Sequence, residues 1–192
     1  MRMKGLSQLD EKLLDASLLK PDDSGLWLMG PAGGPGGAFF DDWGDKNYNP
    51  HTIKIHKVEA RHGDTLDSLT VTYLVDGKLV PPIKHGNSGG GPDYSVFVMD
   101  PTDRLVWVIG WIHVFDGTDE LNGLRLGAVR SDGSPNIGLV GKAEGSPFVF
   151  QPDQSVHHPC EIACFGGRQG LFVDALGIYY RVLGPSSKSP RK

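Results

Sequence analysis

Cysteines, excess basic charge and long apolar runs are all scarce in this sequence. Its 192 residues include two cysteines, and 19 lysines and arginines against 23 aspartates and glutamates. No apolar segment approaches the roughly 20 residues that cross a membrane. The basic residues are scattered outside the C-terminal tail, so they form no stripe for a nucleic acid. We therefore expect neither a membrane span nor a nucleic-acid partner.

The first residues are not typical of a secretory signal, because acidic residues interrupt any apolar stretch in residues 1–12. A cytoplasmic location is therefore the default expectation, with export by an unconventional route still compatible with the sequence. Cys160 and Cys164 are expected on one strand, with their Cα atoms about 13 Å apart, which is too far for a disulfide. We expect two reduced, buried thiols.

The sequence also lacks a recognisable set of catalytic or metal-binding residues. His157 and His158 precede Cys160, but no second pair of ligands has matching spacing, so a surface loop is expected there. The glycine run at 33–37 differs from a phosphate-binding loop, because Pro35 removes a donor and no Lys-Ser/Thr pair follows. No nucleophile–base set is evident. The expectation is a protein that is not an enzyme and uses no metal or cofactor.

Glycine and proline are abundant, with 27 and 14 residues, which is typical of many short strands joined by tight turns. We expect one domain at 25–183, preceded by a leader at 1–24 and followed by a disordered tail at 184–192. The leader has leucines at helical spacing over residues 6–19 and predicts a short amphipathic helix, which either packs on its own chain or forms a dimer contact. Strands are predicted at residues 53–56, 69–75, 95–99, 105–115, 124–129, 148–150, 161–165 and 178–183.

Within this domain the sequence repeats itself three times. Gly63 to Asp67 and Gly170 to Asp174 have the same glycine-to-aspartate spacing at the start of a strand, and Asn122 occupies the equivalent place between them. The steps 67 to 122 to 174 are 55 and 52 residues. Glycine pairs ending at 37, 90 and 145 (the last a weak Glu-Gly pair) interleave with a similar period. Two markers with one period of about 54 residues predict an all-β fold of three antiparallel sheets around a pseudo-threefold axis.

The repeated turns have the chemistry to bind a ligand with adjacent hydroxyl groups. A carboxylate accepts two hydrogen bonds while neighbouring backbone N–H groups donate. The paired glycines would form the opposite wall, since a residue without Cβ lets the backbone approach the ligand closely. Phe172 would offer an apolar edge to a sugar ring. Alternatively, Asp67 and Asp174 simply cap their own turns, as aspartate commonly does.

These segments resemble the jacalin-related lectins over about residues 25 to 183. The resemblance rests on three stretches: Gly33-Gly34-Pro35-Gly36-Gly37 with Phe40-Asp41-Asp42, His85-Gly86-Asn87-Ser88-Gly89-Gly90, and Phe165-Gly166-Gly167-Arg168 leading to Asp174-Ala175-Leu176-Gly177-Ile178-Tyr179. It implies a β-prism of three Greek-key-like sheets and carbohydrate binding without catalysis. The chain is continuous where galactose-binding members are usually cleaved, so the resemblance favours mannose or glucose glycans.

The resemblance also implies which residues bind the sugar. In the mannose-binding branch, the main site joins the first glycine loop to the last turn, which corresponds here to Gly37, Gly170, Leu171, Phe172 and Asp174. A second site found in some members corresponds to Asp64, Thr65, Asp67 and Gly90. The third face, with Asn122 and Glu144-Gly145, departs from the pattern and is expected to be inactive.

Two functions remain open at this point. The first is a lectin that forms a homodimer, through the leader helix or an edge strand, and so gains strength from several weak sites. The second is a protein-interaction module on the same prism, whose sugar sites have degenerated and whose leader recruits a partner. Loss of mannose binding on replacing Asp174 would favour the first.

Overall fold

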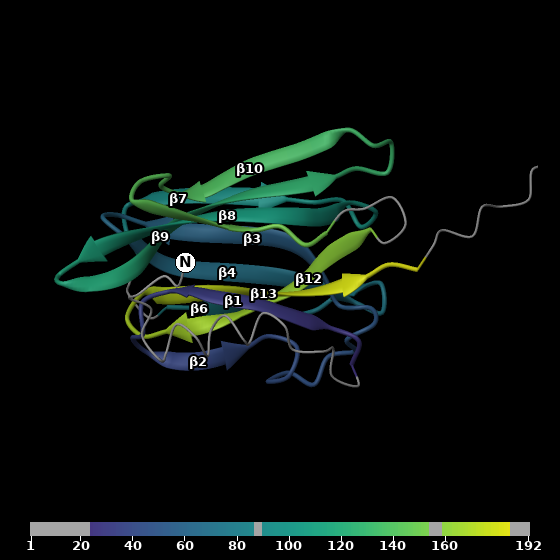
Figure 1. The fold of residues 1–192 in the computed structure, drawn as a ribbon, viewed down its shortest axis with the longest axis horizontal. Helices are drawn as coiled ribbons and strands as arrows, with labels where there is room; N and C mark the ends of the chain where they lie inside the picture. Colours follow the sequence, from purple (N-terminus) through teal and green to yellow (C-terminus); the bar gives the residue numbers. More distant parts are fainter. Residues whose placement is uncertain (1–23, 87–89, 154–158, 185–192) are drawn as a thin grey trace, which may run out of the picture.

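A computed structural model describes residues 24–86, 90–153 and 159–184 of the chain. Within these ranges it contains thirteen β-strands and no helix, as the glycine-rich composition predicts. The strands form three antiparallel sheets that pack around one interior (Figure 1). The predicted all-β prism is therefore confirmed. The predicted helix at 6–19 and most of the tail at 184–192 lie outside the described residues.

Each sheet is built in a similar way. The first has the order β1 (Trp27–Gly33), β13 (Val173–Val182), β12 (Cys160–Gln169) and β2 (Ala38–Asp41). The second has β5 (Lys78–Leu79), β4 (Leu66–Val75), β3 (Lys54–His62) and β7 (Asp93–Val98), with β6 (Ile83–His85) also paired to β4. The third has β10 (Pro135–Gly141), β9 (Thr118–Val129), β8 (Arg104–Phe115) and β11 (Ser146–Phe150).

In the second and third sheets, three consecutive strands form a meander and the last strand returns beside the first, which is the Greek-key order. The first sheet has the same spatial order, but it joins β1 and β2 from the start of the domain to β12 and β13 from its end. This closure brings the glycine loop between β1 and β2 next to the last hairpin, although the two are more than 130 residues apart in sequence.

The core lies where the inner faces of the three sheets meet. On β4, alternate residues Leu69, Val71 and Tyr73 are fully buried, and Leu124 and Leu176 from the other two sheets are equally inaccessible. Strand alternation places these side chains on one face, and removing them from water stabilises the fold. Cys160 and Cys164 both lie buried on β12 and are not joined by a disulfide, as expected from the sequence.

A buried polar network joins two of the sheets. Asp42, directly after β2, accepts a hydrogen bond from the Tyr73 hydroxyl and lies 2.9 Å from His85 Nε2. The Tyr73 oxygen also accepts from the Phe165 amide at 3.3 Å, and Phe40 stacks on His85 with ring centroids 3.7 Å apart. Burial, followed by the charge of Asp42, raises the pKa of Tyr73. This tyrosine therefore stays neutral and acts as a donor.

The threefold repeat is visible in the register of the strands. In each central hairpin, one residue of the second strand has no partner, which defines a β-bulge near the end of the pairing. These three bulged residues are Asp67, Asn122 and Asp174. The two aspartates and the asparagine that share a sequence period therefore share a structural position, one in each sheet.

Within the part of the chain that the structure describes, there is no helix that is long and apolar enough to cross a membrane.

Candidate functional site

The turn between β12 and β13 holds Asp174 in a buried position. The Gly170 amide donates to the Phe172 carbonyl at 3.0 Å, which closes a tight turn just before the bulge. Asp174 is only 6% exposed, while Leu171 at the tip of the turn is 69% exposed. The turn therefore exposes Leu171 at its tip and keeps one carboxylate buried near its base.

The glycine loop between β1 and β2 packs directly on this carboxylate. The Gly34 amide donates to the Asp174 carbonyl at 2.9 Å. A Cβ added at Gly36 would lie 2.3 Å from Asp174 Oδ1, and one at Gly37 would lie 2.6 Å from Oδ2 and 2.1 Å from the Gln169 carbonyl. Gly37 also has a φ of +61°, which favours glycine. Any side chain at either position would displace the aspartate or the loop.

Arg168 fixes the glycine loop from the other side. Its Nε donates to the Gly36 carbonyl at 2.8 Å, and its second guanidinium nitrogen donates to the Gly37 carbonyl at 2.9 Å. These two bonds use the fork geometry of arginine to pin two consecutive carbonyls. They turn the Gly36 and Gly37 carbonyls toward β12 and stabilise the loop in its position above Asp174.

The structure adds a third wall that the sequence patterns did not predict. β9 begins at Thr118, six residues before the strand predicted at 124–129, and extends the β8–β9 hairpin to a turn at Asp116 and Gly117. Both turn residues have positive φ, +48° and +78°, which is the two-residue turn that Asp-Gly favours. This hairpin projects from one end of the prism (Figure 1). The Asp-Gly pair after a predicted strand was the sequence signal that would have located it.

The projecting hairpin packs against the glycine loop and the last turn. Phe115 meets Phe172 edge to face, with ring centroids 5.4 Å apart. A Cβ at Gly34 would lie 1.9 Å from the Asp119 carbonyl. The glycine loop, the hairpin and Asp174 border an open hollow of about 400 Å³, whose walls include Pro35, Gly36, Val114, Thr118, Glu120 and Asp174. Of the residues predicted for the main site, Asp174 lines this hollow, whereas Gly37, Gly170, Leu171 and Phe172 lie outside its lining.

Glu120 is the second carboxyl group of this hollow. It is 5% exposed, and Thr118 donates to its Oε1 at 3.0 Å. Burial, and next the negative charge of Asp174, raise the pKa of Glu120. Burial also raises the pKa of Asp174, against the opposing effects of a hydrogen bond from Glu120 and the charge of Arg168. Glu120 therefore takes up a proton before Asp174 does, and its carboxyl, once protonated, donates a hydrogen bond to the Asp174 carboxylate.

Two oxygens in this hollow have unused hydrogen-bonding capacity. While both carboxyl groups are ionised, Asp174 Oδ2 and Glu120 Oε2 are buried and accept no hydrogen bond from the described residues. Buried acceptors without donors are costly and uncommon in folded proteins. A ligand that donates hydroxyl groups would satisfy them.

Known proteins share the sequence pattern of this domain. Residues 29–179 match the family model of the jacalin-like lectin domain. The chain belongs to this lectin family. Jacalin-related lectin 3 of Arabidopsis thaliana is 27% identical over 170 residues, covering 88% of the chain but 26% of that relative. Horcolin of Hordeum vulgare is 28% identical over 153 residues, covering 79% of the chain and 94% of that relative.

Solved structures agree on the fold. A mannose-binding jacalin-related lectin from Ananas comosus is 25% identical with a TM-score of 0.64, covering 83% of this lectin chain and 99% of its own. A mannose-specific jacalin-related lectin from Morus nigra, solved with mannose, is 27% identical with a TM-score of 0.62, covering 80% and 93%. The structural neighbours are thus lectins that bind mannose, and the likeness extends over nearly all of each.

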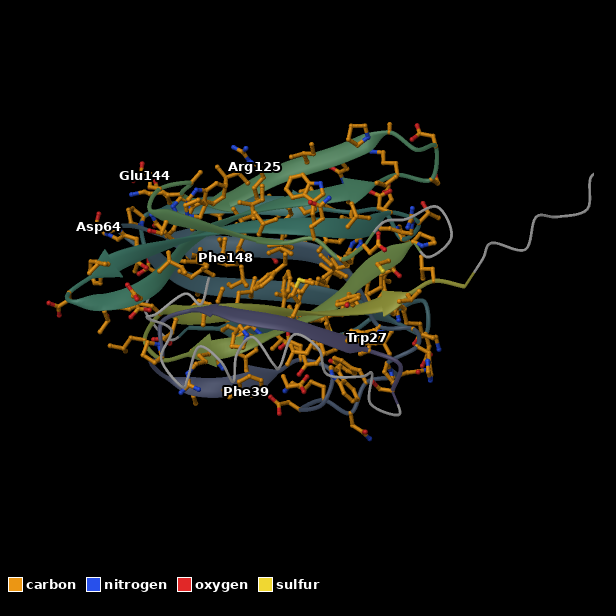
Figure 2. The ribbon with its side chains drawn as sticks, viewed as in Figure 1. Trp27, Phe39, Asp64, Arg125, Glu144 and Phe148 are labelled. Carbon is orange, nitrogen blue, oxygen red and sulfur yellow. The ribbon has the colours of Figure 1, made fainter. Side chains whose placement is uncertain are left out.

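The first-repeat turn of this lectin domain differs from the last one in detail. Asp64 is exposed and is labelled in Figure 2 toward the end from which the β8–β9 hairpin projects. Thr65 is 2% exposed, and its hydroxyl donates inward to the Leu121 carbonyl at 3.0 Å. Asp67 is half-buried in its bulge. The groups of this turn that could contact a ligand are therefore the carboxylates of Asp64 and Asp67 and the backbone. The Thr65 hydroxyl is instead used in a hydrogen bond within the protein.

The glycine opposite this turn is one position later than the pattern of glycine pairs in the sequence predicts. A Cβ at Gly91 would lie 2.2 Å from the His62 carbonyl, which matches the position of Gly37 against Gln169. A Cβ at Gly90 would instead meet Arg61 Cδ at 2.9 Å. The second candidate site thus combines Asp64 and Asp67 with Gly91, and Gly90 lies toward the outer face of the sheet.

The third turn is closed by its own side chain. Asn122 is 1% exposed, and its Nδ2 donates to the Glu144 carbonyl at 3.0 Å. A Cβ at Gly145 would lie 2.1 Å from the Ile112 carbonyl, so the loop packs tightly on β8. The asparagine thus uses its amide to hold the neighbouring loop, and it has no carboxylate to accept ligand hydroxyls. This arrangement fits the expectation that the third face is inactive.

Proposed function

We propose that this protein is a non-catalytic lectin that binds mannose- or glucose-type glycans in the hollow around Asp174. The observation that carries the proposal is the buried Asp174 Oδ2, which faces a glycine loop and, while Glu120 is ionised, receives no donor from the described residues. The similarity to mannose-binding jacalin-related lectins supports the same chemistry.

In this proposal a sugar ring is held in the hollow by two adjacent hydroxyl groups. Two hydroxyl groups donate to the carboxylate of Asp174, and the backbone N–H groups of Leu171, Phe172 and Gly37 donate to ring or hydroxyl oxygens. The edge of Phe172, held by Phe115, contacts the C–H face of the ring. The β8–β9 hairpin with Glu120 would be the part of the wall that distinguishes one glycan from another.

Each site should bind a monosaccharide weakly. A few hydrogen bonds to a neutral sugar replace bonds to water, so a dissociation constant of about a millimolar is expected. Useful affinity would then come from several sites acting together, which can gain roughly 10²–10⁴ over one site. We propose that the turn at Asp64 and Asp67 supplies a second site and that a cytoplasmic homodimer doubles the number.

The main site is tested by comparing Asp174→Ala with Leu171→Ala on mannose resin. Asp174→Ala removes the charged acceptor and should abolish retention. Leu171→Ala changes an exposed side chain and keeps its backbone N–H, so retention should persist. Equal loss in both variants would contradict the assignment, and normal retention of Asp174→Ala would favour an interaction module with degenerate sugar sites.

The proposed valency has its own test. Titration calorimetry with methyl mannoside should give two sites per chain for the wild type and one for Asp67→Ala. Light scattering on the same samples should give the mass of a dimer. A monomer that binds one monosaccharide tightly would refute the multivalent arrangement.

A further inference from the structure

A second hollow, of about 240 Å³, lies on the outer face of the sheet that contains β3 and β4. It shares no lining residue with the hollow at Asp174. Six of its eight lining residues have polar or charged side chains, in contrast to the inner face of the same sheet. Its principal side chains are Glu59, Arg61, Ser68, Thr70, Lys84 and Tyr94.

The strand register gathers these side chains on one face in two adjacent rows. In the first row, Arg61 of β3 lies between Ser68 of β4 and Tyr94 of β7. In the second row, Thr70 of β4 lies between Glu59 of β3 and Lys84 of β6. Directly paired residues and residues two apart project from the same side of a sheet, so both rows point into this hollow.

The hollow carries positive charge that the carboxylates of the described residues do not neutralise. The carboxylate of Glu59 is paired with Lys57 Nζ at 2.8 Å and accepts a hydrogen bond from the Tyr94 hydroxyl. Arg61 lies over the Tyr94 ring, 5.5 Å from its centroid. Among the described residues, no carboxylate forms an ion pair with Arg61 or Lys84. Two cations are thus presented beside two hydroxyl groups.

Arg61 is held in place by its neighbours. The ring of Tyr94 supports the guanidinium from one side, and the tyrosine is itself fixed by its bond to Glu59. On the other side, the absence of a side chain at Gly90 leaves room for the Arg61 stem, since a Cβ there would lie 2.9 Å from Cδ. A preorganised guanidinium loses less entropy when it binds, and its fork matches an oxyanion.

We propose that this hollow binds an acidic sugar unit, through a sulfate ester or carboxylate held by Arg61 and Lys84. The hydroxyls of Ser68 and Thr70 would bond the ring oxygens or hydroxyls of the same unit. The volume is below the roughly 300–1,000 Å³ of pockets for drug-sized ligands, so it suits one charged ring. Because Gly90 borders the hollow close to the first-repeat turn, an acidic unit bound here would lie on the same side of the prism as Asp64 and Asp67.

The test is an NMR titration at low salt with glucose 6-sulfate, using glucose and inorganic sulfate as comparison probes. Arg61→Gln and Lys84→Gln should each weaken binding of the sulfated sugar about tenfold, since each removes one charge-assisted contact. Lys78→Gln on β5 makes the same change of charge in the same sheet outside the hollow and should have no effect. Asp174→Ala should also have no effect, which separates this site from the proposed mannose site.

Raising the salt concentration should weaken binding of the sulfated sugar, because the contact is between exposed charges. Thermal melting of each variant checks that the fold is intact, and the exposed Lys84 keeps the test usable if Arg61→Gln is unstable. The proposal is overturned if glucose 6-sulfate gives no saturable shifts, or if Lys78→Gln weakens binding as much as Lys84→Gln. Equal affinity for inorganic sulfate and the sulfated sugar would overturn the assignment of a sugar ring.

Discussion

Asp174→Asn separates the binding role of this residue from a purely structural one. The substitution keeps the shape of the side chain and removes its charge. Burial raises the pKa of Asp174 above its ordinary value of 3.8, so the carboxylate is less stable in the fold than in water. A neutral amide should therefore be accepted, as it is at Asn122, where the equivalent bulge already contains an asparagine whose amide donates to a backbone carbonyl.

The sign of the pH dependence follows from the same shift. A carboxyl whose pKa is raised in the folded state contributes stability below its unfolded pKa and loses that contribution as the pH rises through the folded pKa. At neutral pH, Asp174 and Glu120 thus both lower the stability of the wild type. We expect Asp174→Asn to melt at the same temperature as the wild type or higher at pH 7, and to depend less on pH between neutral and mildly acidic conditions.

The effect on sugar binding is expected in the opposite direction. Hydrogen bonds to a charged group contribute about 1.5–3 kcal/mol each, against about 0.5–1.5 kcal/mol for neutral partners. For two hydroxyls that donate to Asp174, the loss is roughly 2–3 kcal/mol, or about 30- to 150-fold in affinity. Titration with methyl mannoside, beside thermal melting of the same samples, measures both quantities. A variant that binds normally but melts at a lower temperature would show that Asp174 only supports its turn.

Three further results are expected. Gly36→Ala should weaken mannoside binding at least tenfold, because its Cβ would lie 2.3 Å from Asp174 Oδ1. Gly184→Ala, which has open space around the added Cβ, should bind normally, and equal binding by the two variants would refute the packing argument. Wild-type mannoside binding should fall on acidification, because binding needs the carboxylate of Asp174. The fall should begin at a higher pH than for an ordinary aspartate with a pKa of 3.8, since burial raises the pKa of Asp174. A flat pH profile would contradict this. Tyr73→Phe should cost about 1–3 kcal/mol in urea unfolding, because it leaves the buried Asp42 without its hydroxyl donor, and a change below about 0.5 kcal/mol would show that the network is not needed.

The sequence predicted the features that depend on local spacing. The period of about 54 residues predicted three sheets, and the shared bulge of Asp67, Asn122 and Asp174 explains why that period exists. The proximity of Gly37 to Asp174 followed from the resemblance, and the closure of the first sheet by both ends of the domain accounts for it physically.

The features that the sequence did not predict are contacts between sheets. Glu120 lies beside Asp174 because a long hairpin of the third sheet packs on a turn of the first, and no short-range pattern records that contact. Thr65 fits the motif of the second site, but its hydroxyl bonds to Leu121 in another sheet. Likewise, Gly91 rather than Gly90 faces His62, because the register of β3 and β7 decides which glycine meets the turn.

The most direct test of the account is a crystal structure of the protein soaked with methyl α-mannoside. We expect one sugar in the hollow bordered by the glycine loop, Asp174 after the last turn, and the β8–β9 hairpin. Two of its hydroxyl oxygens should lie about 2.5–2.7 Å from Asp174 carboxylate oxygens, the range for a hydroxyl donating to a charged acceptor. A saturated crystal with that hollow empty, or with the sugar bound only at the Asn122 turn, would contradict it.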